Sequence, residues 1–207
     1  ESLWRHAEQA VYAAKTAGPS TSRFFADDMN AAASAKLELE SDLRQAIAGE
    51  GLRLFFQPKV DVASGRMIGA EALLCWQHPR RGLLGPLQFI PLAEECGLIV
   101  ALGDWVVAAA ASHLRTWADA GIETVAVSVN LASPSFLQSD IVDRLVGIVR
   151  RAGVVPRQFV LELTESLLMV DSEQTIAVLD RLREQGFGLS LDDFGTGYSS
   201  LSYLKRF

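Results

Sequence analysis

Hydrophobic positions repeat with helical spacing over residues 1–17, which predicts an amphipathic helix at the start of the chain. Gly18-Pro19-Ser20 follows and is expected to end that helix. A second helical pattern opens at Asp27-Asp28 and reaches about Ala48, with a composition typical of a partly exposed connecting helix. We therefore expect a connecting segment over residues 26–50 and the main domain over residues 51–207.

Beyond residue 51, strand-like and helical patterns alternate. The expected strands cover residues 52–62, 67–76, 124–131, 158–166 and 187–193, and the expected helices cover residues 87–96, 100–120, 135–152, 172–185 and 198–206. Repeated strand–helix units predict an α/β fold with a largely parallel sheet and helices outside it. Ala63-Ser64-Gly65-Arg66 is too short for a parallel crossover, so the first two strands should be antiparallel.

Five strands do not close an eight-stranded barrel. Either the sheet is an open α/β sheet, or further strands follow Phe207. The chain stops inside a helical pattern without a capping residue, which favours the second interpretation.

Composition narrows the function classes. The 207 residues are 49% hydrophobic and carry a net charge of −6, which is typical of a soluble globular protein and disfavours electrostatic capture of a nucleic acid polymer. A small anionic ligand remains compatible with this charge, because a few local cations or a bound metal can form a phosphate site.

Apolar runs fall short of the roughly 20 residues of a membrane span, so this chain should be cytoplasmic even where further domains tether its parent to a membrane. Cys75 and Cys96 lack metal-binding spacing and are expected to be reduced thiols.

Acidic and amide side chains recur near the ends of the predicted strands. They are Glu71 on the second strand, Asn130 on the third, Glu162 and Glu165 on the fourth, and Asp192 with Asp193 on the fifth. In parallel α/β folds the reactive groups gather at the carboxyl ends of the strands. Any one of these residues could be a helix cap, an ion pair or a solvated strand end. Oxygen donors converging from several strands instead indicate Mg²⁺ or Mn²⁺, with the adjacent aspartates bridging two ions that activate water for phosphodiester hydrolysis.

A series of motifs in this order resembles the EAL domain family over residues 51–207. The motifs are Phe56-Gln57-Pro58-Lys59-Val60, Glu71-Ala72-Leu73-Leu74, Trp76-Gln77-His78-Pro79, Phe89-Ile90-Pro91-Leu92-Ala93-Glu94, Ser128-Val129-Asn130-Leu131, Glu162-Leu163-Thr164-Glu165 and Asp192-Asp193-Phe194-Gly195-Thr196-Gly197. Such a series is far more specific than a single motif. The resemblance implies a modified TIM (β/α)8 barrel with an antiparallel first strand, of which this chain holds about the first five strands. It also implies metal-dependent hydrolysis of cyclic di-GMP to linear pGpG.

The resemblance also implies roles for individual residues. Glu71, Asn130, Glu162, Asp192 and Asp193 match the ligands of two Mg²⁺ or Mn²⁺ ions, and Glu71, Asp192 and Asp193 are thereby the expected catalytic positions, with Glu165 bracing the loop Phe194-Gly195-Thr196-Gly197. Gln57, Leu73, Cys75, Phe89 and Pro91 match positions that hold the ligand. The family also leads us to expect a homodimer formed near the loop that follows the fifth strand.

Cys75 departs from the family pattern, because active members usually have an arginine there that contacts a ligand phosphate. Strand alternation places Glu71, Leu73 and Cys75 on one face, so the thiol should point toward the ligand. Loss of a charge-assisted contact should weaken binding roughly ten- to hundredfold. A tolerated substitution is an equally good interpretation, and a redox-sensing thiol is disfavoured because no obvious cation lowers its pKa.

The two ends of the chain carry further expectations. Residues 1–25 resemble the tail of a GGDEF (diguanylate cyclase) domain, on the marks His6-Ala7-Glu8-Gln9-Ala10-Val11-Tyr12-Ala13-Ala14-Lys15, Gly18 and Phe24-Phe25. The nucleotide-binding part of a cyclase is absent from this stretch. The catalytic lysine of the EAL family is expected beyond Phe207, so the 207-residue piece alone should be inactive.

Three functions remain open from the sequence. The first is an active cyclic di-GMP phosphodiesterase in the intact parent, favoured because every expected metal-ligand position in this stretch carries an oxygen donor. The second is a degenerate receptor that binds cyclic di-GMP without cleaving it, a kind of protein that usually lacks some of those ligands. The third is an interaction or dimerisation module, for which the loop after Asp193 would be unnecessary.

Overall fold

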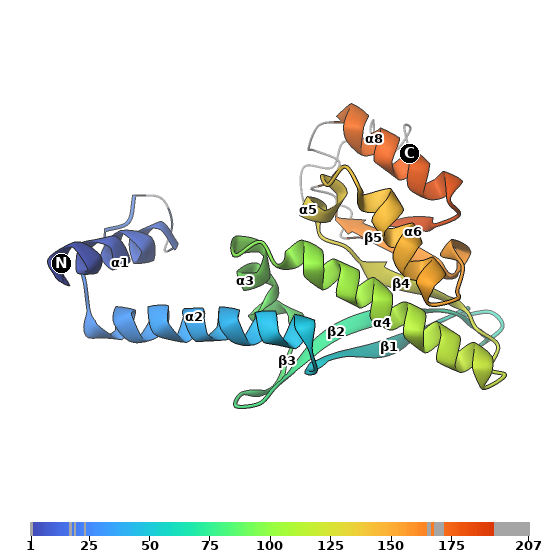
Figure 1. The fold of residues 1–207 in the computed structure, drawn as a ribbon, viewed down its shortest axis with the longest axis horizontal. Helices are drawn as coiled ribbons and strands as arrows, with labels where there is room; N and C mark the ends of the chain where they lie inside the picture. The colour runs from blue at the N-terminus through green and yellow to red at the C-terminus, as the bar shows by residue number, and fades with distance from the viewer. Residues whose placement is uncertain are drawn as a thin grey trace. The chain divides into compact units, whose positions relative to one another are not determined.

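The computed structural model describes residues 2–16, 18, 20–22, 24–164, 167 and 172–192, which divide into two compact units. The first unit, Glu1–Ala48, contains helix α1 (Ser2–Thr16) and helix α2 (Asp27–Ala48), as Figure 1 shows. The ring of His6 stacks on the ring of Phe25 with 3.9 Å between the centroids. This stacking holds Phe25 against α1.

The second unit, Gly49–Phe207, is built on one mixed sheet. Its strands are β1 (Leu52–Val60), β2 (Met67–His78), β3 (Gly82–Leu84), β4 (Ala126–Asn130), β5 (Phe159–Thr164) and β6 (Gly188–Asp192). The strand order is β1-β2-β4-β5-β6, with β3 paired to β2. The first two strands are antiparallel and the pairs β2–β4, β4–β5 and β5–β6 are parallel, as the sequence predicted. The short strand β3 was not predicted.

Three long helices cover one face of this sheet in chain order: α4 (Ile99–Asp119), α6 (Ile141–Arg151) and α8 (Ser172–Glu184) (Figure 1). Apolar strand residues alternate toward them. Phe56 packs edge-on against His113 and Trp117 of α4, at centroid distances of 5.1 and 4.8 Å. Val129 and Leu161 are fully buried on the same side. The hydrophobic core of the unit therefore lies between the sheet and this helical layer.

Two predicted helices are each divided in the structure. The prediction for residues 87–96 corresponds to a 3₁₀ turn, η1 (Pro86–Gln88), and helix α3 (Ile90–Glu95), because Phe89 leaves helical geometry with φ −137°. Pro91 then occupies the first turn of α3, where its missing N–H costs no hydrogen bond. The prediction for residues 135–152 corresponds to α5 (Ser133–Phe136) and α6, and a 3₁₀ turn, η2 (Pro156–Gln158), precedes β5. The helix predicted over residues 198–206 lies outside the described residues.

An arginine ties two of the covering helices together. Nε of Arg144 on α6 donates to Oδ1 of Asp104 on α4 at 2.9 Å, and Nη1 donates to Asp140. Burial acts to lower the pKa of Arg144, but the hydrogen bonds and charges of Asp104 and Asp140 outweigh burial and raise it. The guanidinium therefore stays charged and fixes the two helices in register.

No helix within the described part of the chain combines the length and apolar character needed to cross a membrane.

Candidate active site

The strand register places four predicted oxygen donors on one face of the sheet. Glu71 pairs with Ser128 across β2 and β4, Asn130 pairs with Glu162 across β4 and β5, and Thr164 pairs with Asp192 across β5 and β6. Residues opposite each other in register share a face, as do residues two apart on a strand. Glu71, Asn130, Glu162 and Asp192 therefore all project from one face, and Phe56 shows that the other face carries the helices. We call the face that carries these four residues the polar face.

Two of the four donors contact each other directly. Nδ2 of Asn130 donates a hydrogen bond to Oε1 of Glu71 at 3.0 Å. A side-chain amide has one donating and one accepting end. Because the nitrogen is turned toward Glu71, the oxygen of Asn130 is turned away from it and is left to accept from, or coordinate, another group.

Glu162 is the most buried of these donors, with 7% of its side chain exposed. Nζ of Lys59 on β1 lies 2.6 Å from its Oε1 and also donates to Oγ of Ser128 at 2.7 Å. An unpaired carboxylate at this depth would be costly, so the ion pair with the lysine offsets the cost of burying Glu162. Lys59 was not among the predicted site residues, although strand alternation from Gln57 puts it on the polar face.

A glycine allows the lysine to cross the neighbouring strand. Gly69 on β2 pairs with Lys59 in register, and a Cβ built at Gly69 would lie 3.8 Å from Cβ of Lys59 and 3.3 Å from the backbone oxygen of Ala126. The absence of a side chain at position 69 therefore keeps open the path of the lysine toward Ser128 and Glu162.

The aspartate end of the site is only partly described. Asp192 is exposed at the last residue of β6. Opposite it in register, Thr164 lies with its hydroxyl 3.3 Å from that of Ser133. Asp193, Glu165 and the loop Phe194-Gly195-Thr196-Gly197 lie outside the described residues. Within the described ranges, no three His, Cys, Asp or Glu side chains come close enough together to hold a metal ion.

The predicted ligand-holding residues occupy different environments. Gln57 is exposed on the polar face, directly opposite Glu71. Leu73 follows Glu71 on that face and lines a cavity of about 490 Å³ together with Ile90 and Asn130. Pro91 is exposed at the start of α3. Gln57 and Leu73 therefore flank Glu71 on the polar face, the first across the β1–β2 ladder and the second along β2.

Phe89, Cys75 and His78 occupy three different positions. Phe89 is completely buried, with its ring 5.7 Å from that of Trp76, so it contributes through packing. Cys75 is half-buried and lies opposite Arg53 of β1 in register. His78, two residues past the predicted end of the strand at residue 76, is the buried last residue of β2, and its Nδ1 accepts hydrogen bonds from the backbone N–H groups of Arg80 and Arg81.

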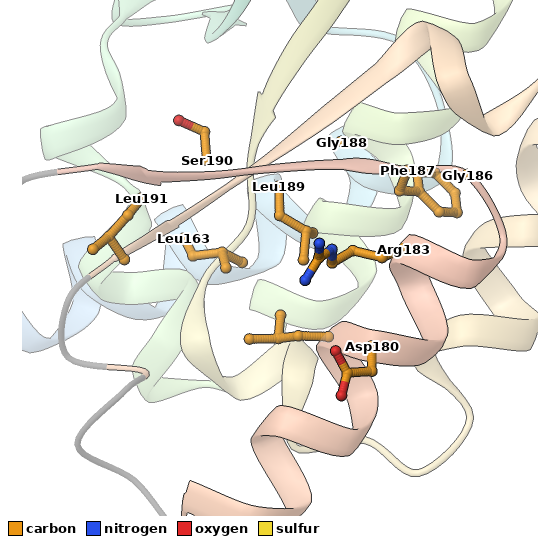
Figure 2. A pocket seen from close by; sticks show the side chains of 10 residues that line it. Leu163, Asp180, Arg183, Gly186, Phe187, Gly188, Leu189, Ser190 and Leu191 are labelled. Carbon is orange, nitrogen blue, oxygen red and sulfur yellow. The ribbon is translucent and has the colours of Figure 1, made fainter. Parts of the chain in front are cut away.

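A separate cavity of about 460 Å³ lies on the helical side of β6 (Figure 2). Leu163, Leu189 and Leu191 point into it alongside Asp180 and Arg183 of α8, whereas Ser190 points the opposite way. Ser190 pairs with Glu162 in register. The cavity in Figure 2 is therefore on the side of the sheet away from the polar face.

The chain is similar to a known domain family and to several curated proteins. A family model described as the EAL domain matches residues 40–207. MucR of Pseudomonas aeruginosa, named a bifunctional diguanylate cyclase/cyclic di-GMP phosphodiesterase, is 45% identical over 204 residues, which cover 99% of this chain and 30% of that protein. NbdA of the same organism, named a cyclic di-GMP phosphodiesterase, is 42% identical over 206 residues, which cover 100% of this chain and 26% of that protein.

Solved structures give the same relationship. The PaMucR phosphodiesterase in complex with c-di-GMP superposes with a TM-score of 0.76 at 46% identity, covering 82% of this chain and 68% of that one. The EAL enzyme Bd1971, in a form bound to cAMP and cyclic di-GMP, superposes with a TM-score of 0.75 at 32% identity, covering 84% of this chain and 48% of that one. The chain spans less than a third of the length of these two curated relatives.

Proposed function

This chain belongs to the EAL domain family, and on that premise we propose that the protein containing it hydrolyses cyclic di-GMP to linear pGpG at the polar face of the sheet. The observation that carries the proposal is the shared face of four oxygen donors, Glu71, Asn130, Glu162 and Asp192, which follows from three strand pairings. The partial α/β barrel supplies this face because the strands curl with their helices outside.

The donor set fits a hard divalent cation in chemistry. All four side chains offer oxygen, the donor type that Mg²⁺ and Mn²⁺ prefer over sulfur or imidazole. We propose that these residues, joined by Asp193, hold Mg²⁺ or Mn²⁺. When bound, such ions would polarise a phosphate oxygen and lower the pKa of a water molecule for attack on phosphorus.

The residues of the chain itself position the reacting groups. Asn130 orients Glu71 through the 3.0 Å hydrogen bond and keeps its own oxygen turned outward. Lys59 fixes the position of the Glu162 carboxylate through the 2.6 Å contact. Gln57, beside Glu71, is placed to donate to a ligand oxygen, and Leu73 with Ile90 forms an apolar wall on which a base can lie. Hydrolysis breaks one of the two phosphodiester bonds of the ring, and the proton and hydroxide of water complete the two new ends of pGpG.

The test is cleavage of cyclic di-GMP by the full-length protein in Mg²⁺ or Mn²⁺, with pGpG followed by chromatography. We expect product formation that stops in EDTA and that falls by about a hundredfold in Glu71→Gln. Glu184→Gln, at the exposed end of α8, is the matched control because it removes the same charge away from the polar face. Ligand binding by the wild-type protein without any product would replace the enzyme proposal with a receptor for cyclic di-GMP.

A further inference from the structure

The first two strands form a ladder of residue pairs on the polar face. Arg53 lies opposite Cys75, Phe55 opposite Leu73, and Gln57 opposite Glu71. The ladder runs without a register shift until Lys59, so these pairs point to the same side. One end of the ladder therefore presents a guanidinium and a thiol, and the other end presents the proposed catalytic carboxylate.

Arg53 is a cation without a partner in the described part of the chain. It is exposed, and it makes no hydrogen bond or ion pair with any described residue. Lys59, on the same strand and face, is committed to Glu162 and Ser128. A free guanidinium has a rigid set of donors that matches the oxygens of a phosphate group.

An anionic ligand bound at the polar face would require such a cation to hold it. Glu71, Glu162 and Asp192 make its far end acidic, which suits metal ions but repels the backbone of an anionic ligand. A cyclic dinucleotide carries two phosphodiesters, and only one of them can lie at the carboxylates. The second must be held elsewhere, and the Arg53 end of the ladder begins about 13 Å from Glu71, at two residues per rung.

Cys75 fits this arrangement because of its position opposite Arg53. Directly opposed like charges on antiparallel strands destabilise a sheet, so an arginine at position 75 would repel Arg53. The small neutral thiol leaves the guanidinium free to turn toward a ligand. The phosphate contact that Cys75 cannot make is available from the neighbouring strand.

We propose that Arg53 binds the phosphodiester of cyclic di-GMP that is not cleaved, as a ligand-binding residue of this chain. The proposal rests on the function proposed above, since it assigns a second contact to the same ligand. Arg53 takes no part in bond breaking, so its contribution is to affinity and to the position of the ring.

The experiment uses the full-length protein and compares Arg53→Gln with wild type, with Arg53→Lys and with the control Arg66→Gln. Arg66 is exposed in the turn between β1 and β2, at the other end of the same hairpin. Affinity for cyclic di-GMP is measured by calorimetry in EDTA, and KM and kcat are measured in Mg²⁺.

We expect Arg53→Gln to weaken binding and to raise KM roughly ten- to hundredfold, with a smaller effect on kcat, because a contact to the non-reacting phosphate is retained through the reaction. Arg53→Lys should lose less, and Arg66→Gln should behave as wild type.

A double variant distinguishes the loss of the positive charge from a loss of structure at position 53. In Arg53→Gln/Cys75→Arg the cation is moved across the rung, and we expect it to recover most of the lost affinity. Equal KM and affinity in Arg53→Gln and Arg66→Gln, with wild type fully active, would overturn the role of Arg53 and leave the proposed function intact. Failure of the double variant to recover affinity would also overturn it, provided that its melting temperature matches that of Arg53→Gln. Failure of the wild type to bind or cleave cyclic di-GMP would instead refute the proposed function itself.

Discussion

The ammonium nitrogen of Lys59 lies 2.6 Å from Oε1 of Glu162, although their strands, β1 and β5, are separated in the sheet by β2 and β4. In a flat sheet three strand spacings would place these backbones about 14 Å apart, beyond the reach of one lysine side chain. The contact therefore requires the sheet to curl about the polar face, as strands do in a barrel. It also shows that the polar face is the concave side.

Replacing Lys59 with methionine should destabilise the protein in the absence of metal ions. Glu162 is left buried and unpaired, but 40% of the lysine side chain is exposed, so the cost should be about 2 kcal/mol, between the values for exposed and fully buried pairs. Thermal unfolding of the full-length protein in EDTA measures this cost. The double variant Lys59→Met/Glu162→Gln should recover part of the loss, and an unchanged melting temperature in Lys59→Met would contradict the ion pair.

The same variant should respond more strongly to Mg²⁺. Because the ammonium group and a metal ion compete for Oε1 of Glu162, removing the lysine should increase the rise in melting temperature that Mg²⁺ produces. The exposed Arg66→Met variant serves as a control for the loss of one positive charge. Equal Mg²⁺ responses in the two variants would argue against metal binding at Glu162.

Enlarging Gly69 should disturb the lysine from the neighbouring strand. Gly69→Ala introduces a Cβ only 3.3 Å from the backbone oxygen of Ala126 and should cost about 1 kcal/mol. Gly69→Val should also displace Lys59, so its cost and that of Lys59→Met should be less than additive. Gly65→Ala is the control: it strains a turn residue with φ +68° but has no atom within 4 Å, so its cost should add fully to that of Lys59→Met. Unfolding measurements on the single and double variants test the difference.

Much of the strand framework could be predicted from the sequence because strand alternation and turn length are local properties. The short connection Ala63-Ser64-Gly65-Arg66 required an antiparallel first pair, and the structure has one. The helices were harder to predict from the sequence, since a single residue can interrupt a helix even where the hydrophobic pattern is continuous. Phe89 leaves helical geometry and is buried beside Trp76, which divides the helix predicted over residues 87–96. Burial against a distant strand is not visible in local periodicity.

The candidate site was likewise predictable from the sequence in part only. The shared face of Glu71, Asn130 and Glu162 follows from alternation and parallel pairing, so it was predictable. Lys59 was missed because its partner lies three strands away, and only the curvature of the sheet brings them together. The pairing of Arg53 with Cys75 was missed because it depends on the exact register of the first hairpin.

The turn between β1 and β2 should show a measurable acid dependence. The Asp61 carboxylate accepts hydrogen bonds from the hydroxyl and the backbone N–H of Ser64, and these bonds, the hydroxyl first, lower the pKa of Asp61 below its usual 3.8. A folded-state pKa below the unfolded value stabilises the folded protein above the unfolded pKa, and that stability is lost as the pH falls through the folded pKa. Asp61→Asn should therefore lower the melting temperature near neutral pH and have a vanishing effect at strongly acidic pH. In Ser64→Ala, an NMR titration should find the pKa of Asp61 moved upward, and an unmoved value would refute the role of the hydroxyl.

Asn130 should be more sensitive to a change of charge than to its size. Asn130→Asp keeps the shape and the oxygen, but it replaces the donor that contacts Oε1 of Glu71 with a second anion. Two carboxylates at this distance repel each other, so in metal-free protein the pKa of at least one of them should rise, which titration by NMR would detect. Asn130→Ala removes the donor without adding charge and should lower phosphodiesterase activity by about tenfold to a hundredfold, as expected when a group that orients a metal ligand is lost. If Asn130→Asp retained wild-type activity at every Mg²⁺ concentration, the hydrogen bond to Glu71 would have no part in positioning it, and the amide would act through its oxygen alone.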